Sequence, residues 1–269
     1  MDTRDTRDTR RNIALLLAYD GSSYHGWQVQ KNAVTVAAVL SGALQKTTGR
    51  PVTLHGCGRT DTGVHARRYV ANFISATRIP AERLPYAVNT HLPDDISVFA
   101  AADVPDNFHA INSCVRKEYT YCLYTARHPD PLLRRRALFW PYPLDADALR
   151  RAAGDFIGTH DFAAFRSVGT PVKSTVRTMF SCDVSTRGRL LQIAVSADGF
   201  LYNMARAIVG TLLYVGQGKI HSDAVPALLR AGDRARAGPT APAHGLYMTG
   251  AWYETALPWP AVARRDADL

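Results

Sequence analysis

The chain has 269 residues, of which 46% are hydrophobic and 20% are charged. This composition is typical of a globular protein with one large domain or two small ones, and it excludes a chain that is disordered throughout. The longest apolar run, residues 13–19, is far shorter than the roughly 20 residues that a membrane span needs. We see no secretory signal and therefore expect a cytoplasmic protein.

The formal net charge of +9 is unevenly distributed. Residues 111–269 carry 20 basic and 13 acidic residues, whereas residues 12–110 carry 8 and 7. A basic excess of this kind indicates a polyanionic partner, most simply a nucleic acid, or serves only to keep the protein soluble. The four cysteines have no zinc-type spacing and are expected to be reduced thiols. We expect neither a metal nor another cofactor.

The first half of the chain follows a tail. Residues 1–11 repeat Asp-Thr-Arg three times and predict disorder. Alternating apolar residues predict a strand over 12–19, and helical spacing predicts a helix over 34–48 that Gly49 and Pro51 end. Further strands are expected at 51–56, 69–75 and 95–102, and a helix at 80–89. Residues 103–112 are expected to join the two halves.

The second half repeats the same order with longer insertions. Strands are expected at 115–125, 174–186, 189–198 and 246–253, and helices at 145–154, 201–216 and 223–231, with surface loops at 128–143 and 239–242. The order β-α-β-β-α-β in each half predicts an α/β protein made of two ferredoxin-like halves with antiparallel sheets flanked by helices. The expected domains are residues 12–110 and the basic half 111–255, followed by a tail over 256–269.

The segment from His55 to His65 contains three glycines, one cation, Arg59, and one carboxylate, Asp61. Glycines permit tight turns and a close approach of backbone to a ligand. A tight loop between strands can hold Asp61 rigidly at the mouth of a cleft. Alternatively, Asp61 only satisfies backbone N–H groups in an Asx turn. No helical pattern follows Gly63, which argues against a phosphate-binding loop.

Two other segments carry candidate functional residues. Tyr119 and Tyr121 share one face of a predicted strand, where they either stack on nucleobases or pack into the sheet. Arg206 lies among apolar positions of the predicted helix 201–216 and needs a carboxylate partner. Asp61 is a candidate for that partner.

Five motifs follow one another across residues 12–255, at residues 19–28 (YDGSSYHGWQ), 58–66 (GRTDTGVHA), 116–121 (RKEYTY), 199–206 (GFLYNMAR) and 241–246 (APAHGL). With these motifs in this order, the chain resembles the bacterial tRNA pseudouridine synthase A family. The resemblance implies the pseudouridine synthase fold, two α/β halves around a basic cleft. It also implies an isomerase without a cofactor that acts on uridines 38, 39 and 40 in the anticodon stem-loop of tRNA, and a homodimer.

The resemblance also implies roles for single residues. Asp61 matches the catalytic aspartate, Tyr119 the tyrosine that contacts the target base, and Arg206 the arginine that pairs with the aspartate. Arg59 matches an arginine that helps to extrude the base, and Leu246 is expected to contact the substrate. Further RNA contacts are expected, each with a solvated surface position as the alternative, at Arg78, His109, Arg127, Lys173 and Arg177.

Two other function classes remain open from the residues. A ferredoxin-like RNA-binding module would act without catalysis, but the chain has no match to the RNP signatures of such modules. A metal-dependent nuclease or hydrolase would need several converging acids or histidines, whereas the motifs offer one acid.

Overall fold

The computed structural model describes residues 10–167 and 171–259, which divide into two compact units. The first unit contains residues 10–62, 66–114 and 251–259, and the second contains residues 63–65, 115–167 and 171–250. Most of the two predicted tails, residues 1–9 and 260–269, lies outside the described residues. The domain boundaries expected from the sequence stay predictions.

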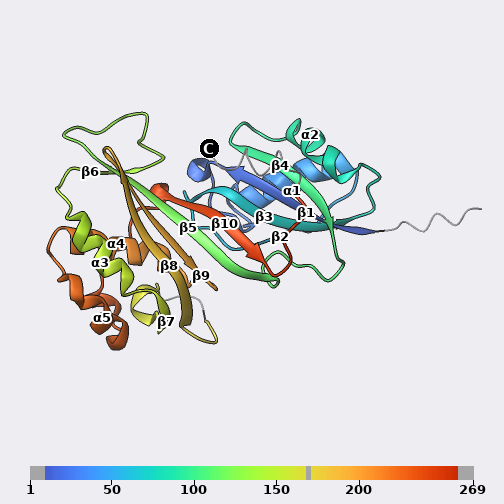
Figure 1. The fold of residues 1–269 in the computed structure, drawn as a ribbon. Coiled ribbons are helices and arrows are strands. Elements are labelled where there is room, and N and C mark those ends of the chain that lie inside the picture. Colours follow the sequence, from blue (N-terminus) through green and yellow to red (C-terminus); the bar gives the residue numbers. More distant parts are fainter. Residues whose placement is uncertain (1–9, 168–170, 260–269) are drawn as a thin grey trace, which may run out of the picture. The chain divides into compact units, whose positions relative to one another are not determined.

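The first unit has the element order β-α-β-β-α-β (Figure 1). Its elements are β1 (Arg11–Tyr19), α1 (Val36–Thr48), β2 (His55–Gly56), β3 (His65–Ser75), α2 (Leu84–Asn89) and β4 (Ile96–Val104). Their strands pair antiparallel in the order β4-β1-β3, and β2 pairs with the other edge of β3. This is the strand order of a ferredoxin-like fold.

The central strand β1 is buried on both faces over residues 12–17. Residues 105–110 contact the sheet that contains it. The side-chain amide of Asn12 donates to the carbonyl oxygens of Pro105 at 3.0 Å and Phe108 at 2.8 Å, and the Ala110 N–H donates to the Asn72 side chain at 2.9 Å. The predicted connection 103–112 is therefore an integral part of the first unit.

Helix α1 ends where the sequence predicted, because Gly49 adopts a left-handed conformation (φ 76°) and its N–H caps Gln45 at 2.9 Å. The strand predicted over 51–56 is shorter than expected. Only His55 and Gly56 pair with β3, and Pro51 at the start of the stretch has no N–H to give to a ladder.

The second unit repeats the order with three added elements (Figure 1). It comprises β5 (Cys114–Thr125), β6 (Leu138–Trp140), α3 (Ala146–Gly154), β7 (Gly158–Asp161), β8 (Val176–Arg187), β9 (Leu190–Ala197), α4 (Met204–Gly216), α5 (Val225–Ala231) and β10 (Leu246–Tyr253). The strand order is β10-β5-β9-β8-β7, and β6 pairs parallel with β5. Without β6 and β7, this is again the ferredoxin-like order.

The predicted fold class, α/β with antiparallel sheets flanked by helices, is confirmed. The short strands β6 and β7 were missed because three or four residues carry no readable period, and β6 lies in a stretch predicted as loop. Helix α4 begins at Met204 and not at residue 201, because Asn203 before it is left-handed (φ 61°). In the described part of the chain, no helix has the length and apolarity of a membrane span.

Candidate active site

Asp61 lies in the loop between β2 and β3, on a backbone that is fixed at the preceding residue. Its side chain is half-buried and that of Arg59 is exposed, whereas Thr60 between them has only 7% of its surface exposed. The Thr60 hydroxyl hydrogen-bonds the Tyr19 hydroxyl at 2.9 Å, and the Thr60 carbonyl accepts the N–H of Trp27 at 3.2 Å. Two residues of the motif at residues 19–28 therefore hold Thr60, next to the carboxylate.

A cluster of aromatic rings packs against this loop. The rings of Trp27 and Tyr69 lie 4.2 Å apart and those of Tyr19 and Tyr69 lie 5.7 Å apart. The Tyr69 hydroxyl donates to the Gly58 carbonyl and accepts the Gly58 N–H. Glycine is required at position 56, because a Cβ there would stand 2.2 Å from the Tyr69 hydroxyl oxygen. The backbone of the loop is thus in close contact with buried aromatic rings.

Gly26 connects the same loop to helix α1. Its φ of +80° favours glycine, and a Cβ at this position would lie 2.2 Å from the Thr60 carbonyl oxygen and 3.1 Å from the Asp61 carbonyl carbon. Its own carbonyl accepts the N–H of Val36 at the start of α1, at 3.1 Å. The motif at residues 19–28 therefore positions the backbone of Asp61, a role that the sequence alone did not reveal.

Tyr119 and Tyr121 lie on one face of β5, as the alternation predicted, and both are buried, with 7% and 0% of their surfaces exposed. The Tyr119 ring meets the ring of Phe200 edge to face at 4.9 Å. Tyr121 donates its hydroxyl to the Pro242 carbonyl at 2.9 Å, and burial raises the pKa of this hydroxyl. Of the two readings, Tyr121 is thus a core residue, and the role of Tyr119 stays a prediction.

Leu246 begins β10 and is buried. The preceding Gly245 allows its segment to touch the Tyr121 ring, because a Cβ at Gly245 would be 2.6 Å from the phenol carbon Cζ. The motif at residues 241–246 and the β5 tyrosines therefore belong to one packed cluster of the second unit.

Arg206 lies in the first turn of α4 and is half-buried. Its Nε donates to the Ala241 carbonyl at 2.7 Å and its Nη1 donates to the Asn203 side-chain oxygen at 2.8 Å. The Asn203 amide in turn donates to the Ser167 hydroxyl at 2.8 Å. The guanidinium is therefore oriented by groups of the second unit, and its expected pairing with Asp61 of the first unit stays a prediction.

The end of the glycine-rich motif joins the cluster of the second unit through His65, which the sequence reading did not assign. Its Nε2 lies 3.1 Å from the His244 carbonyl oxygen, and its ring stacks on Tyr247 at 4.6 Å. Burial, and next the nearby His65, lower the pKa of His244. Both histidines lie inside motifs that the sequence analysis identified, His65 in residues 58–66 and His244 in residues 241–246.

The remaining cationic candidates differ in exposure. Four of them are exposed, namely Arg59, Arg78, Arg127 and Lys173. Arg177 is half-buried and donates to the carbonyls of Ser174 at 3.0 Å and Val176 at 2.6 Å. His109 is also half-buried, with its ring 4.4 Å from that of His55. Burial, and next His109, lower the pKa of His55.

Among the described residues, no group of three or more His, Cys, Asp or Glu side chains is placed so that it could hold a metal ion. Cys57, which lies near His55 and His65 in sequence, is buried, and its N–H bonds the Val70 carbonyl at 2.8 Å.

Comparison with known proteins gives the family. Residues 16–111 and 152–254 match the family model described as tRNA pseudouridine synthase. The chain is 50% identical to tRNA pseudouridine synthase A of Thermoanaerobacter sp. (strain X514) over 238 residues, which are 88% of this chain and 98% of the relative. It is 46% identical to the protein of that name from Acetivibrio thermocellus over 243 residues, which are 90% of this chain and 100% of the relative.

Among solved structures, the chain is similar to one titled as the archaeal box H/ACA sRNP Nop10-Cbf5 complex, with 12% identity and a TM-score of 0.38. The match covers 89% of this chain and 49% of that one, so this chain spans about half its length.

The matches to the family model and to the curated relatives cover most of the chain and confirm the resemblance read from the five motifs. This chain therefore belongs to the tRNA pseudouridine synthase family, a family of isomerases.

Proposed function

We propose that this chain converts uridine to pseudouridine at positions 38, 39 and 40 in the anticodon stem-loop of tRNA, with Asp61 as the catalytic carboxylate and without a cofactor. The family and the names of the relatives support tRNA as the substrate. The positions and the role of Asp61 rest on the motif at residues 58–66.

The chemistry requires no external electrons. The bond between uracil N1 and ribose C1′ breaks, the base rotates, and a new bond forms between C5 and C1′. The C5 proton is lost and N1 gains a proton, so the product is an isomer of the substrate. Asp61 acts either by adding to the sugar or base, or by taking a sugar proton to give a glycal intermediate, and both routes need it ionised and held in place.

Two other side chains have roles in this proposal. Arg59 is exposed beside the carboxylate and can take the place of a stacked base, since extrusion of a nucleotide costs a few kcal/mol. Tyr119 stacks on the target base and is suited to removing the C5 proton late in the reaction.

The observation that carries the proposal is the fixed backbone under Asp61. Thr60 is buried and hydrogen-bonded to Tyr19 and Trp27. Of its two neighbours, Arg59 is exposed and Asp61 is half-buried. A carboxylate held in this way is suited to a reaction that depends on exact placement, because the geometry is prepared before the substrate binds.

The test is to replace Asp61 by Asn, which removes the charge, and by Ala, which also removes the hydrogen-bonding group. Both variants are expected to bind an unmodified tRNA transcript about as well as the parent and to form no detectable pseudouridine. The pseudouridines are mapped in the transcript after incubation with pure protein. Asp94→Asn, which changes an exposed carboxylate of the same unit, is the matched control and should retain full activity.

Folding is checked by circular dichroism and by the melting temperature, since removal of one partner from a buried charge pair can cost about 3–5 kcal/mol. A folded Asp61→Ala protein that still converts uridine at the parental rate would overturn the catalytic assignment. If the chain were instead an RNA-binding module without catalysis, the parental protein itself would form no pseudouridine. A nuclease would cleave the transcript and lose this activity in a chelator.

We also propose that the protein acts as a cytoplasmic homodimer, on the strength of the family resemblance. Sedimentation equilibrium of the pure protein tests the dimer, and a single species at the 29.5 kDa monomer mass would refute it.

A further inference from the structure

His65 lies near the end of the motif that carries Asp61, and the proposed chemistry does not use its side chain. It begins β3, and only 2% of its surface is exposed. Val64 before it is buried as well. A side chain buried to this degree does not reach a substrate, so its contribution to the site must come from the groups that it contacts within the protein.

The His65 ring makes two defined contacts, both with residues of the second unit. Its Nε2 lies 3.1 Å from the His244 carbonyl oxygen. Because a carbonyl oxygen can only accept, the proton of this hydrogen bond is on Nε2. The ring also stacks on that of Tyr247, with ring centres 4.6 Å apart and an angle of 23° between the planes. The direction of the N–H and the plane of the ring are therefore both fixed.

The segment that accepts this hydrogen bond is itself held by other side chains. The Ala241 carbonyl accepts from Arg206 Nε at 2.7 Å, and the Ala241 N–H donates to the Arg206 carbonyl at 3.1 Å. The Pro242 carbonyl accepts the Tyr121 hydroxyl at 2.9 Å. The carbonyls of residues 241, 242 and 244 thus each receive a side-chain donor from a different motif. The His244 carbonyl is therefore a fixed point to which His65 is attached.

Asp61 lies in a short stretch of chain that is held at both ends. Thr60 before it is hydrogen-bonded within the first unit, whereas residues 63–65 belong to the second unit. Gly63 is left-handed (φ 79°), and a Cβ on it would lie 3.5 Å from the Cβ of Ala243. Because so few residues separate the two fixed ends, a displacement of either end is transmitted to the carboxylate.

We propose that His65 is a positioning residue of the reaction, which holds Asp61 in place by donating its Nε2 proton to the His244 carbonyl. The inference rests on the proposed catalytic role of Asp61. His65 itself exchanges no proton with the substrate, because it is buried and its Nε2–H is engaged. Misplacement of a catalytic group by about 1 Å can lower a rate by about 10²-fold, so loss of this hydrogen bond should lower kcat far more than tRNA affinity.

The test compares side chains that differ in where they place an N–H group. The amide nitrogen of Gln reaches about as far as His Nε2, that of Asn lies about where Nδ1 lies, and Phe keeps a ring without a donor. We expect His65→Gln to retain kcat within about fivefold, and His65→Asn and His65→Phe to lose about 10²-fold. KM and the dissociation constant for an unmodified tRNA transcript should stay within about threefold of the parental values in all three variants.

The matched control is His160→Phe. His160 lies in β7 of the same unit and bonds a backbone carbonyl in the same way, with its Nε2 2.9 Å from the Ile157 oxygen. This variant should keep the parental kcat. The melting temperature of each variant shows whether it is folded. If His65→Phe does not fold, the pair His65→Gln and His65→Asn still decides the proposal, because both side chains are amides that differ in reach.

The position of the loop is also measured without catalysis. The amide NMR signals of residues 61–63 should move in His65→Asn and His65→Phe and stay near their parental positions in His65→Gln. The proposal is overturned if a folded Asn or Phe variant keeps the parental kcat, or if the Gln variant loses as much as the Asn variant. A parent that forms no pseudouridine refutes the proposed function instead, and the NMR signals then still decide whether His65 fixes this loop.

Discussion

Replacing Gly26 by Ala should impair catalysis, although Gly26 is not itself among the residues proposed to contact the substrate. The new Cβ would stand 2.2 Å from the Thr60 carbonyl oxygen, whereas ordinary contacts begin near 3.4 Å. The backbone beside Asp61 must therefore move by roughly 1 Å, a displacement that can lower a rate by about 10²-fold. The positive φ of +80° adds a cost of about 1–2 kcal/mol to folding for a residue with a side chain.

The assay follows pseudouridine formation in a tRNA transcript under saturating and limiting substrate, together with the melting temperature and tRNA binding. We expect kcat to fall by roughly 10²-fold and tRNA affinity to stay near the parental value. Gly42→Ala is the control, because Gly42 is exposed in α1 with nothing within 4 Å of a new Cβ. It should retain activity and be more stable by about 0.5–1 kcal/mol. If Gly26→Ala folds and keeps a kcat within threefold of the parent, the reasoning about the loop is wrong.

Three further outcomes are expected. Tyr119→Phe should retain tRNA binding but lose about 10²-fold or more in turnover, and a fully active variant would mean that this ring serves only for stacking. Binding of folded tRNA should weaken steeply as the salt concentration rises, and a flat salt response would contradict this. Arg127→Glu or Lys173→Glu should lower the affinity for all tRNA substrates alike without changing which uridine reacts. The pKa of His244 is lowered in the folded protein, so the unfolded chain binds its proton first as pH falls below about 6.5, and stability should decline there. His244→Gln should make the loss of melting temperature between about pH 7.5 and 5.5 smaller, and an unchanged loss would assign it to other groups.

The sequence alone determined the element order and the identity of the chemical motifs, because both are local properties. Apolar periodicity located β1, α1 and β10, and Gly49 ended α1 at its predicted position, since a left-handed cap needs only its own residue and the preceding turn. Five short motifs identified the family through their order along the chain. The short strands β6 and β7 were not readable, because three or four residues carry no readable period.

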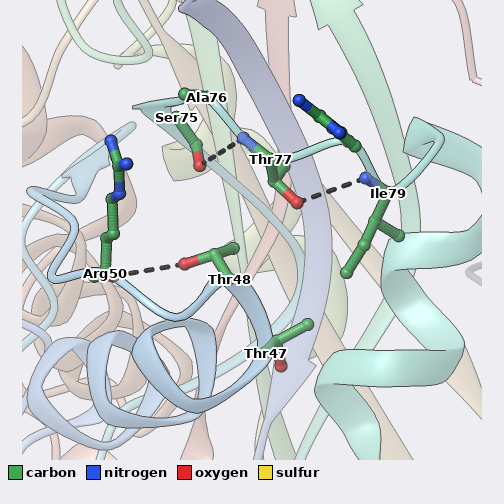
Figure 2. A pocket seen from close by; sticks show the side chains of 8 residues that line it. Thr47, Thr48, Arg50, Ser75, Ala76, Thr77 and Ile79 are labelled. Atoms are coloured by element: carbon green, nitrogen blue, oxygen red, sulfur yellow. Dashed lines mark hydrogen bonds between the residues drawn. The ribbon is translucent and has the colours of Figure 1, made fainter. Parts of the chain in front are cut away.

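Only the tertiary structure decided what the motifs do for one another. Tyr69 is far in sequence from Tyr19 and Trp27, yet the three rings and the glycines at 26 and 56 pack against the loop that carries Thr60 and Asp61. In the second unit, Arg206 reaches across to Ala241 from another motif. A pocket of the first unit likewise combines residues from the end of α1 and the end of β3 (Figure 2). Such contacts cannot be read from spacing, because a sequence records which groups are present, whereas the packing of a sheet and its helices decides which of them come within hydrogen-bonding distance.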